Sequence, residues 1–252
     1  MSSPAVSLLA ITGMPEVRDG DDLTALIAHA TAAQNKPLAD GDVVVITQRI
    51  VSKSEGRVVP LDMFEPSPFA RTWAAPWGHD PRQVEAVLRE STRIVRQVRG
   101  VLITQTRHGY ICANAGVDVS NVGGADLVSL LPEDPDASCR RLRDGLQARL
   151  GVTVAVVMTD TFGRPWRDGQ TNVAIGVAGM RPIRSYEGQT DPEGRPLRVT
   201  AHCVADEIAA GAGLVMGKLD RVPVAIARGV TYEAGEGSAT EIVRPLAMDL
   251  FL

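Results

Sequence analysis

Two short, uninterrupted apolar runs place the strongest constraint on the fold of this chain. They are "GDVVVIT" at residues 41–47 and "GVTVAVVMTD" at residues 151–160, and most of their apolar positions are β-branched. A run this short, with no alternation of polar and apolar residues, is typical of a strand that is covered on both faces. Residues 5–11 and 222–229 have the same character. The sequence therefore predicts a sheet buried between other elements.

Amphipathic segments lie between these runs and predict helices. The segment "GDDLTALIAHATAA" offers Asp21 or Asp22 as an N-cap, and its apolar residues recur at the i, i+3, i+4 and i+7 spacing of one helical face. The pair Asp80 and Pro81 opens a second helix, which we expect to reach Val95. Two further helices are predicted at residues 134–150 and 204–217. Strands that alternate with helices favour the α/β class.

One hairpin modifies that expectation. The segments "GVLITQT" and "YICANAG" flank the turn sequence "RHG" and predict two antiparallel strands. We therefore predict an α/β fold (α+β-like) with mixed sheets and flanking helices. Residues 1–252 are expected to form a single domain, and the Pro- and Trp-rich residues 60–80 mark a candidate junction between subdomains.

Charge and cysteine content narrow the function classes. The formal net charge is −4 and the chain has no basic block, which disfavours nucleic-acid binding but not a small anionic ligand. No apolar run approaches the length of a membrane span, so no membrane partner is expected. The start lacks a basic n-region, and Cys112, Cys139 and Cys203 lie far apart without zinc spacing. These features predict a cytoplasmic protein with small, buried cysteines.

The stretch "MTDTFGRPWRDGQTNVAIG" at residues 158–176 is the first candidate site. We interpret it as a charged loop after a buried strand that ends on Asp160. A carboxylate at such a strand end needs a cation, either from the chain or from a metal, and Thr161 would add an oxygen beside it. Pairing of Asp160 with Arg164 or Arg167, or a turn cap, explains the same residues, and spacing leaves both interpretations open.

A second acidic segment is "NAGVDVSNVGG" at residues 114–124. Asp118 and Asn121 lie three positions apart among small residues, and their oxygens suit a hard divalent ion or a nucleotide hydroxyl or base. When the segment is taken alone, an Asx-turn is the better explanation. Together with Asp160 it supports the hypothesis that two separate segments deliver carboxylates to one Mg²⁺ or Mn²⁺.

Cations follow the strand predicted at residues 41–47. Arg49 and Lys53 in "TQRIVSKSEGR" come directly after it, where a phosphate would be neutralised. The alternative is a solvated surface strand. From the residues alone, the sequence thus indicates an α/β protein whose loops hold a divalent metal and an anionic ligand.

Ordered sequence blocks also resemble a known family. They are "ITGMPEVRDGDDL", "IVSKSEGR", "WGHDPRQVEAVLRES", "ICANAGVDVSN", "LLPEDPDAS", "TDTFGRPWRDGQTNVAIG", "VADEIAAGAGLVMGK" and "PVAIARG". In order and spacing they resemble the coenzyme F420:L-glutamate ligases, or F420-0:γ-glutamyl ligases. Because the chain stops near residue 250, it resembles the stand-alone ligase without a C-terminal nitroreductase-like domain.

The resemblance implies a reaction and a fold. Such enzymes use GTP to join L-glutamate to the carboxylate of the deazaflavin precursor F420-0, through an acyl phosphate, and then extend the γ-glutamyl tail. It implies Mg²⁺ or Mn²⁺ as the metal, with K⁺ as an additional ion. It also implies two intertwined subdomains and a homodimer.

The resemblance also implies site residues. Asp118, Asp160 and Thr161 match the metal-binding positions, and Asp118, Asp160 and Lys53 are expected to carry the catalytic chemistry. The expected nucleotide-binding residues are Gly13, Met14, Pro15, Glu16, Gln48, Arg49, Lys53, Asn121, Met216, Gly217, Lys218, Leu219, Asp220 and Arg221.

One departure from the family pattern keeps other functions open. The chain has Thr47-Gln48-Arg49 where the family usually has Thr-Ser-Lys. Arginine keeps the charge of lysine but changes its geometry. The alternatives are a related metal- and nucleotide-dependent amide ligase with another acceptor acid, a non-catalytic deazaflavin- or nucleotide-binding protein, and a metal-dependent phosphatase.

Overall fold

A five-stranded mixed sheet forms the centre of the fold. The computed structural model describes residues 5–119, 124 and 126–249. The strands lie in the order β1 (Ser7–Ile11), β12 (Val224–Arg228), β2 (Val43–Thr47), β8 (Ala155–Arg164) and β9 (Arg167–Ala178). Only β2 and β8 pair in parallel, and the other neighbours are antiparallel. The predicted α/β fold with mixed sheets is confirmed.

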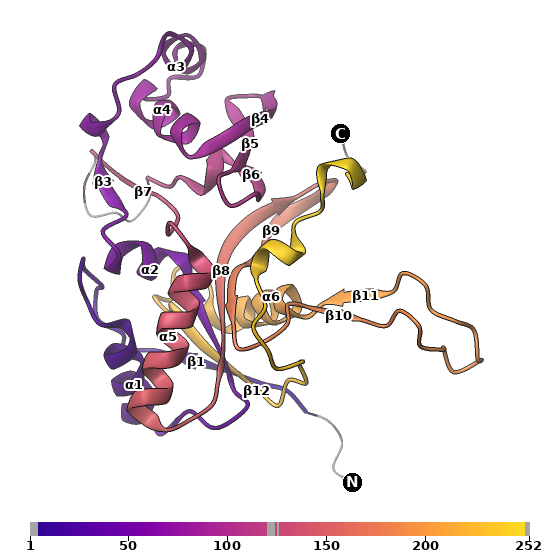
Figure 1. Ribbon diagram of the computed structural model, residues 1–252. Coiled ribbons are helices and arrows are strands. Elements are labelled where there is room, and N and C mark those ends of the chain that lie inside the picture. The colour runs from indigo at the N-terminus through magenta and orange to yellow at the C-terminus, as the bar shows by residue number, and fades with distance from the viewer. Residues whose placement is uncertain (1–4, 120–123, 125, 250–252) are drawn as a thin grey trace.

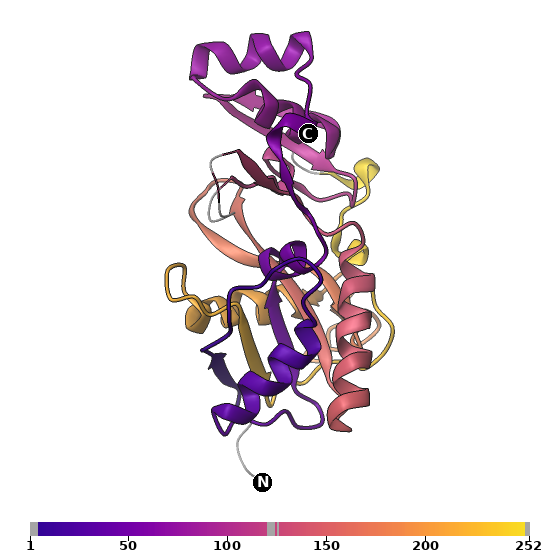
Figure 2. The same cartoon turned by 90° about the vertical axis from the view of Figure 1, so that its left-hand side faces the viewer.

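Helices cover both faces of this sheet. Helices α1 (Leu23–Ala33) and α5 (Pro135–Leu150) pack together on one face, and α6 (Val204–Met216) crosses the opposite face (Figures 1 and 2). This arrangement explains the unbroken apolar runs, because the central positions of β2 and β8 are almost fully buried. Of the two predicted caps of α1, Asp22 is the one used, and it accepts the Ala25 N–H at 3.0 Å.

The helix predicted from Asp80 to Val95 is shorter than expected. Helix α4 (Pro81–Arg89) begins at the predicted cap, but residues Ser91–Val98 form strand β4. Strand β4 pairs with β5 (Val101–Thr106), and β-branched residues from Thr92 to Val98 fit a pleated surface better than a helix. The predicted hairpin is confirmed, because β5 also pairs with β6 (Ile111–Ala113).

The cations after β2 lie on a helix. Residues Gln48–Ser54 form α2, so the expectation of a strand-end loop or a surface strand is wrong. Ser52 donates to the side-chain oxygen of Gln48 at 2.8 Å, and both side chains are buried. Arg49 and Lys53 stand four residues apart and therefore share one side of the helix.

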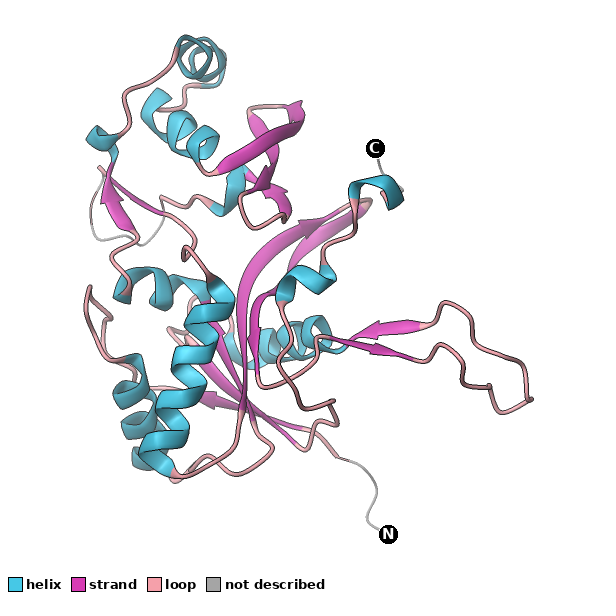
Figure 3. Cartoon of the chain, in the orientation of Figure 1, coloured by secondary structure: helices cyan, strands magenta, loops and turns pink. Residues whose placement is uncertain are grey.

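The charged stretch after Asp160 is a hairpin, and the expectation of a strand that ends on Asp160 is wrong. Strand β8 continues to Arg164, turns at Trp166 and returns as β9. The pairing runs from Asp160 opposite Val173 out to Arg164 opposite Arg167. The charges therefore occupy the exposed end of a long hairpin (Figure 3), where side chains reach water on both faces.

The segment between α2 and α5 packs partly on itself. Strands β3 (Val58–Pro60) and β7 (Leu127–Ser129) pair with each other, so the two ends of this segment lie side by side. Between them lie α3 (Pro68–Ala74), α4 and the β4–β5–β6 sheet. Two clusters of buried side chains, separate from the main core, belong to this segment. The predicted junction at residues 60–80 falls inside it.

The remaining elements are short. The 3₁₀ helices are Leu61–Met63, Ala75–Trp77, Asn114–Gly116, Ala239–Ile242 and Leu246–Met248. Strands β10 (Ile183–Ser185) and β11 (Ala201–Cys203) form an arm that extends away from the sheet (Figure 1). Within the described part of the chain, no helix has the length and apolar character of a membrane span.

Candidate active site

Asp118 and Asp160, which are far apart in the chain, approach each other in the fold. Asp160 lies within β8, and Asp118 is fixed beside β7 by two backbone hydrogen bonds with Ser129, of 2.8 and 3.0 Å. The negative charge of Asp118 is felt at Asp160, where it helps to raise the pKa of that carboxyl. The hairpin and the segment that contains β7 therefore deliver two carboxylates to one region.

The environment of Asp160 disfavours its charged form. Burial is the main cause that raises the pKa of Asp160 to about 6, and the charge of Asp118 adds to it. The Thr161 N–H, which donates to Asp160 Oδ1 at 2.8 Å, and the charges of Lys218 and Arg49 act in the opposite direction. A buried carboxylate of this kind gains from an additional cation.

Helix α2 brings two cations to this region. Arg49 Nη2 donates to Asp118 Oδ2 at 2.5 Å, and the two side chains are 28% and 31% exposed. One turn later, Lys53 forms an ion pair with Glu16, and the Lys53 side chain is 15% exposed. One side of α2 thus connects the acidic pair with the segment Gly13–Glu16.

The segment Gly13–Glu16 meets Lys53 through Glu16, and the loop after α6 carries charges that act on this region. The Lys53 hydrogen bond lowers the pKa of Glu16, and the charges of Arg221 and Arg18 lower it further. Lys218 of the same loop acts on Asp160. The loop after α6 therefore spans the two ends of the site, with Lys218 near the acidic pair and Arg221 near Glu16.

The turn into that loop requires glycine. Gly217 has a φ of +61°, and a Cβ there would lie 1.9 Å from Asp220 Oδ2. Met216, which was expected to contact the nucleotide, is 2% exposed and packs in the main core. Leu219 is 90% exposed and points to solvent.

Two expected site residues, Gln48 and Thr161, have other hydrogen-bond partners within the chain. Gln48 is buried in α2, where its side-chain oxygen accepts from Ser52. The Thr161 hydroxyl donates to Asn172 Oδ1 on β9 at 3.0 Å. Asn121 lies outside the described residues.

The alternative pairings of Asp160 do not occur among the described residues. Strand β8 carries Arg164 to the exposed end of the hairpin, where it donates to the Asp168 carbonyl at 3.1 Å. Asp160 stands inside a strand and caps no turn. The acidic pair with Arg49 and Lys218 nearby is therefore the arrangement that the fold builds.

Sequence reasoning missed Arg18 and Cys112. Arg18 contributes to the field at Glu16, and its place in "PEVRDG" directly after the expected nucleotide turn was an available signal. Burial, with the charge of Asp160, raises the pKa of the Cys112 thiol on β6. No sequence signal links Cys112 to Asp160, because β6 and β8 are far apart in the sequence and come into contact only in the folded chain.

The side chains near Asp118 and Asp160 offer the kind of ligand atoms that a hard divalent cation prefers. In the described ranges no three His, Cys, Asp or Glu side chains form a metal-binding group. Asp118, Asp160 and Thr161 supply only oxygen atoms, as Mg²⁺ and Mn²⁺ prefer, and Mg²⁺ normally completes its shell with waters and substrate phosphates. The residues therefore fit a metal held between protein and phosphate rather than a closed, all-protein cage.

Comparison with known proteins gives one consistent result. The family model described as F420-0:Gamma-glutamyl ligase matches residues 12–229. The chain is 44% identical to the coenzyme F420:L-glutamate ligase of Methanothermobacter thermautotrophicus over 98% of both chains. It is 44% identical to that of Methanopyrus kandleri, over 94% of this chain and 93% of the relative. It is 40% identical to that of Archaeoglobus fulgidus, over 95% and 93%. The chain belongs to the F420-0:γ-glutamyl ligase family.

Proposed function

We propose that this chain uses GTP to join L-glutamate to the carboxylate of the deazaflavin precursor F420-0, and then extends the γ-glutamyl tail. Its relatives are named coenzyme F420:L-glutamate ligases, and the similarity covers nearly the whole chain. The observation that carries the proposal is the approach of Asp118 and Asp160 in a region that also contains Arg49 and Lys218. A carboxylate and a triphosphate are both anions, so a site that joins them needs such cations.

The reaction proceeds in two steps. An oxygen of the acceptor carboxylate attacks the γ-phosphorus of GTP, the bond to the β-phosphate oxygen breaks, and GDP leaves. The amine of glutamate then attacks the carbonyl carbon of the acyl phosphate. Inorganic phosphate leaves with the C–O bonding pair, and the nitrogen loses a proton to form the amide. The first step turns a poor electrophile into one with a good leaving group.

The residues of the chain divide between binding and charge stabilisation. Arg49 and Lys218 hold phosphate oxygens next to the acidic pair, and Lys53 is fixed by Glu16 so that its charge faces the nucleotide. Asp118, Asp160 and Thr161 would hold Mg²⁺ or Mn²⁺. A divalent ion there supplies charge stabilisation for the transferring phosphoryl group. K⁺ remains a prediction that no described side chain supports specifically.

A reaction with defined components tests the proposal. Purified protein with F420-0, GTP, Mn²⁺ or Mg²⁺ and L-glutamate should give glutamylated product, GDP and phosphate, measured by mass spectrometry and phosphate release. Asp160→Asn should abolish product, whereas Asp168→Asn at the exposed hairpin end should not. Folded wild-type protein that forms no product with any nucleoside triphosphate would contradict the proposal. Phosphate release that does not depend on glutamate would favour a phosphatase, and binding without turnover would favour a binding protein.

The buried position of Gln48 supports F420-0 over another acceptor acid. The family departure at this position placed the acceptor in doubt, but Gln48 is bonded to Ser52 inside α2 and 5% exposed. The side-chain amide of Gln48, which is longer than the serine that the family usually has, is therefore held inside the helix. A panel of carboxylic acids in the same assay separates the two possibilities, since a better substrate than F420-0 would establish the alternative.

We also propose that the chain acts as a homodimer. The arm formed by β10, β11 and residues 186–200 extends away from the sheet, and Val199 on it is 92% exposed. An extended arm with exposed apolar surface suits a contact with a second copy. Light scattering after size-exclusion chromatography tests this, and a monomer at micromolar concentration would contradict it.

A further inference from the structure

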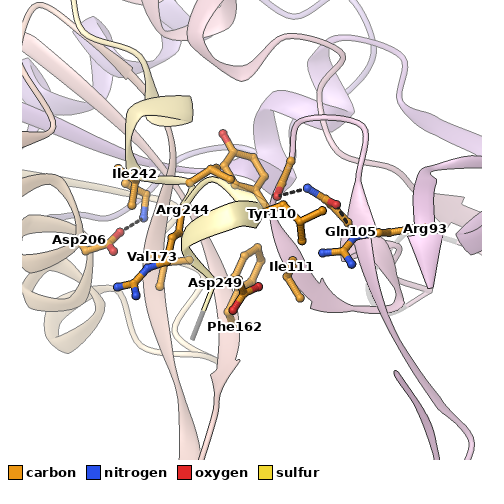
Figure 4. Close-up of a pocket in the computed structure, with 14 residues that line it drawn as sticks. Arg93, Gln105, Tyr110, Ile111, Phe162, Val173, Asp206, Ile242, Arg244 and Asp249 are labelled. Atoms are coloured by element: carbon orange, nitrogen blue, oxygen red, sulfur yellow. Dashed lines mark hydrogen bonds between the residues drawn. The ribbon is translucent and has the colours of Figure 1, made fainter. Parts of the chain in front are cut away.

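A cavity of about 280 Å³ lies between the β8–β9 hairpin, the β5–β6 hairpin and the C-terminal segment that includes residues 242–249 (Figure 4). Its lining is largely apolar. Ile111, Phe162 and Val173 form part of the apolar wall, and Arg93 and Arg244 also line the cavity. None of these residues belongs to the set expected from sequence.

The strand register places this cavity next to Asp160. Val173 stands directly opposite Asp160 in the β8–β9 pairing, and Phe162 follows two positions later on β8. Cross-strand partners and alternate residues share one face of a hairpin, about 7 Å apart along the strand. Ile111 adjoins Cys112, whose thiol feels the charge of Asp160. The apolar wall of the cavity therefore lies directly beside Asp160.

Two arginines supply the positive charges of the cavity lining. Figure 4 shows Arg93 and Arg244 on opposite sides of it. Arg93 Nε donates to Gln105 Oε1 at 2.7 Å, which fixes the guanidinium. Across the described part of the chain, neither arginine has a carboxylate within 4.0 Å. An unpaired guanidinium beside apolar surface is a site for an anion.

The lining also contains two carboxylates, those of Asp206 and Asp249. Asp206 accepts the backbone N–H of Ala174 at 2.8 Å, in the first turn of α6. Asp249 also has an interaction partner. An apolar wall with two available guanidinium groups thus suits a ligand with a flat, apolar body and anionic substituents.

We propose that this cavity binds the acceptor acid, with its deazaflavin ring against Phe162 and Ile111 and its anionic groups held by Arg93 and Arg244. This inference rests on the proposed function. The acceptor carboxylate then faces Asp160, where phosphoryl transfer takes place. Growth of the γ-glutamyl tail adds carboxylates to the same molecule, which the two arginines also attract.

Steady-state kinetics of Arg93→Gln and Arg244→Gln test the proposal. Each variant loses a charged contact to the acceptor, so KM for F420-0 should rise about tenfold or more. KM for GTP should stay within about twofold, because Arg49 and Lys218 are unchanged. Arg96→Gln, on an exposed position of the same strand as Arg93, is the matched control and should leave all constants unchanged.

The outcomes separate the cavity from the reaction. If wild type forms product but both variants keep the wild-type KM for F420-0, the cavity assignment is wrong and the proposed function stands. If KM for glutamate rises instead, the cavity binds the amino acid, which also overturns the assignment. If folded wild type forms no product and binds no F420-0, both fail. Arg244 lies on an exposed segment, so its variant folds even where Arg93→Gln does not.

Discussion

Replacement of Asp160 by Asn should remove activity and at the same time stabilise the metal-free protein. The pKa of Asp160 is about 6, compared with 3.8 for an ordinary aspartate, mainly because the carboxyl is buried. The unfolded chain therefore releases this proton at a lower pH than the folded chain does. Ionisation then costs roughly 3 kcal/mol of unfolding free energy at neutral pH. Asparagine keeps the shape and removes that cost.

The sign of the effect depends on pH. Below about pH 4, Asp160 is protonated in both states and the two proteins should have similar stability. As pH rises from about 4 to 6, the wild type loses stability relative to Asp160→Asn, and the difference stays constant above that range. For a chain of this size, roughly 3 kcal/mol corresponds to a rise in Tm of about 6–12 °C.

Thermal unfolding in EDTA, at a series of pH values, measures this difference. Asp168→Asn, on the exposed end of the same hairpin, is the control and should match the wild type at every pH. Added Mn²⁺ with GTP should stabilise the wild type and leave Asp160→Asn nearly unchanged. An Asp160→Asn protein that is less stable than the wild type at pH 7.5 in EDTA would refute the reasoning.

Two further predictions concern the fold. Gly176→Ala should destabilise the protein by about 1–3 kcal/mol in urea unfolding, because the added Cβ would lie 2.8 Å from the backbone of Pro135. Gly163, where an added Cβ meets no atom within 4 Å, is the control, and its replacement by alanine should cost less. An equal loss of stability in the two variants would contradict the close contact between Gly176 and Pro135. Asp80→Ala should cost about 0.5–2 kcal/mol, since Asp80 caps α4 and bonds to Arg82. Because the Arg82 hydrogen bond lowers the pKa of Asp80, this difference should be present at neutral pH and disappear as pH falls towards 2.

Local sequence signals predicted the elements that local forces determine. The β-branched runs gave β2 and β8 because burial on both faces leaves no polar position in a central strand. The caps of α1 and α4 were visible because a side chain bonds a backbone N–H only two or three residues away. These cap hydrogen bonds can be predicted from neighbouring residues alone, without the rest of the chain.

The errors arose where distant pairing decides the structure. Residues Ser91–Val98 continue an apolar pattern that a helix also fits, and only the pairing with β5 makes them a strand. The charged stretch after Asp160 contains no apolar alternation beyond Phe162, so its extension as a hairpin depends on β9. Helix α2 is too short to show a helical period in the sequence.

The residue types of the candidate site could be chosen from the sequence, but their surroundings could not. Carboxylates and cations after predicted strands indicated a metal and an anion, and family resemblance selected among them. The ion pairs of Arg49 with Asp118 and of Lys53 with Glu16 join segments that have no sequence relation. The cavity with Arg93 and Arg244 had no sequence signal, because segments that are far apart in the chain form it.

The proposed function depends on Asp118 and Asp160 binding the same metal ion. The direct measurement is an anomalous-scattering map of crystals grown with Mn²⁺ and a non-hydrolysable GTP analogue. We predict a manganese peak within coordination distance of both carboxylates, with phosphate oxygens on its other side. Manganese bound elsewhere, with Asp118 still bonded to Arg49 and no metal at Asp160, would contradict it.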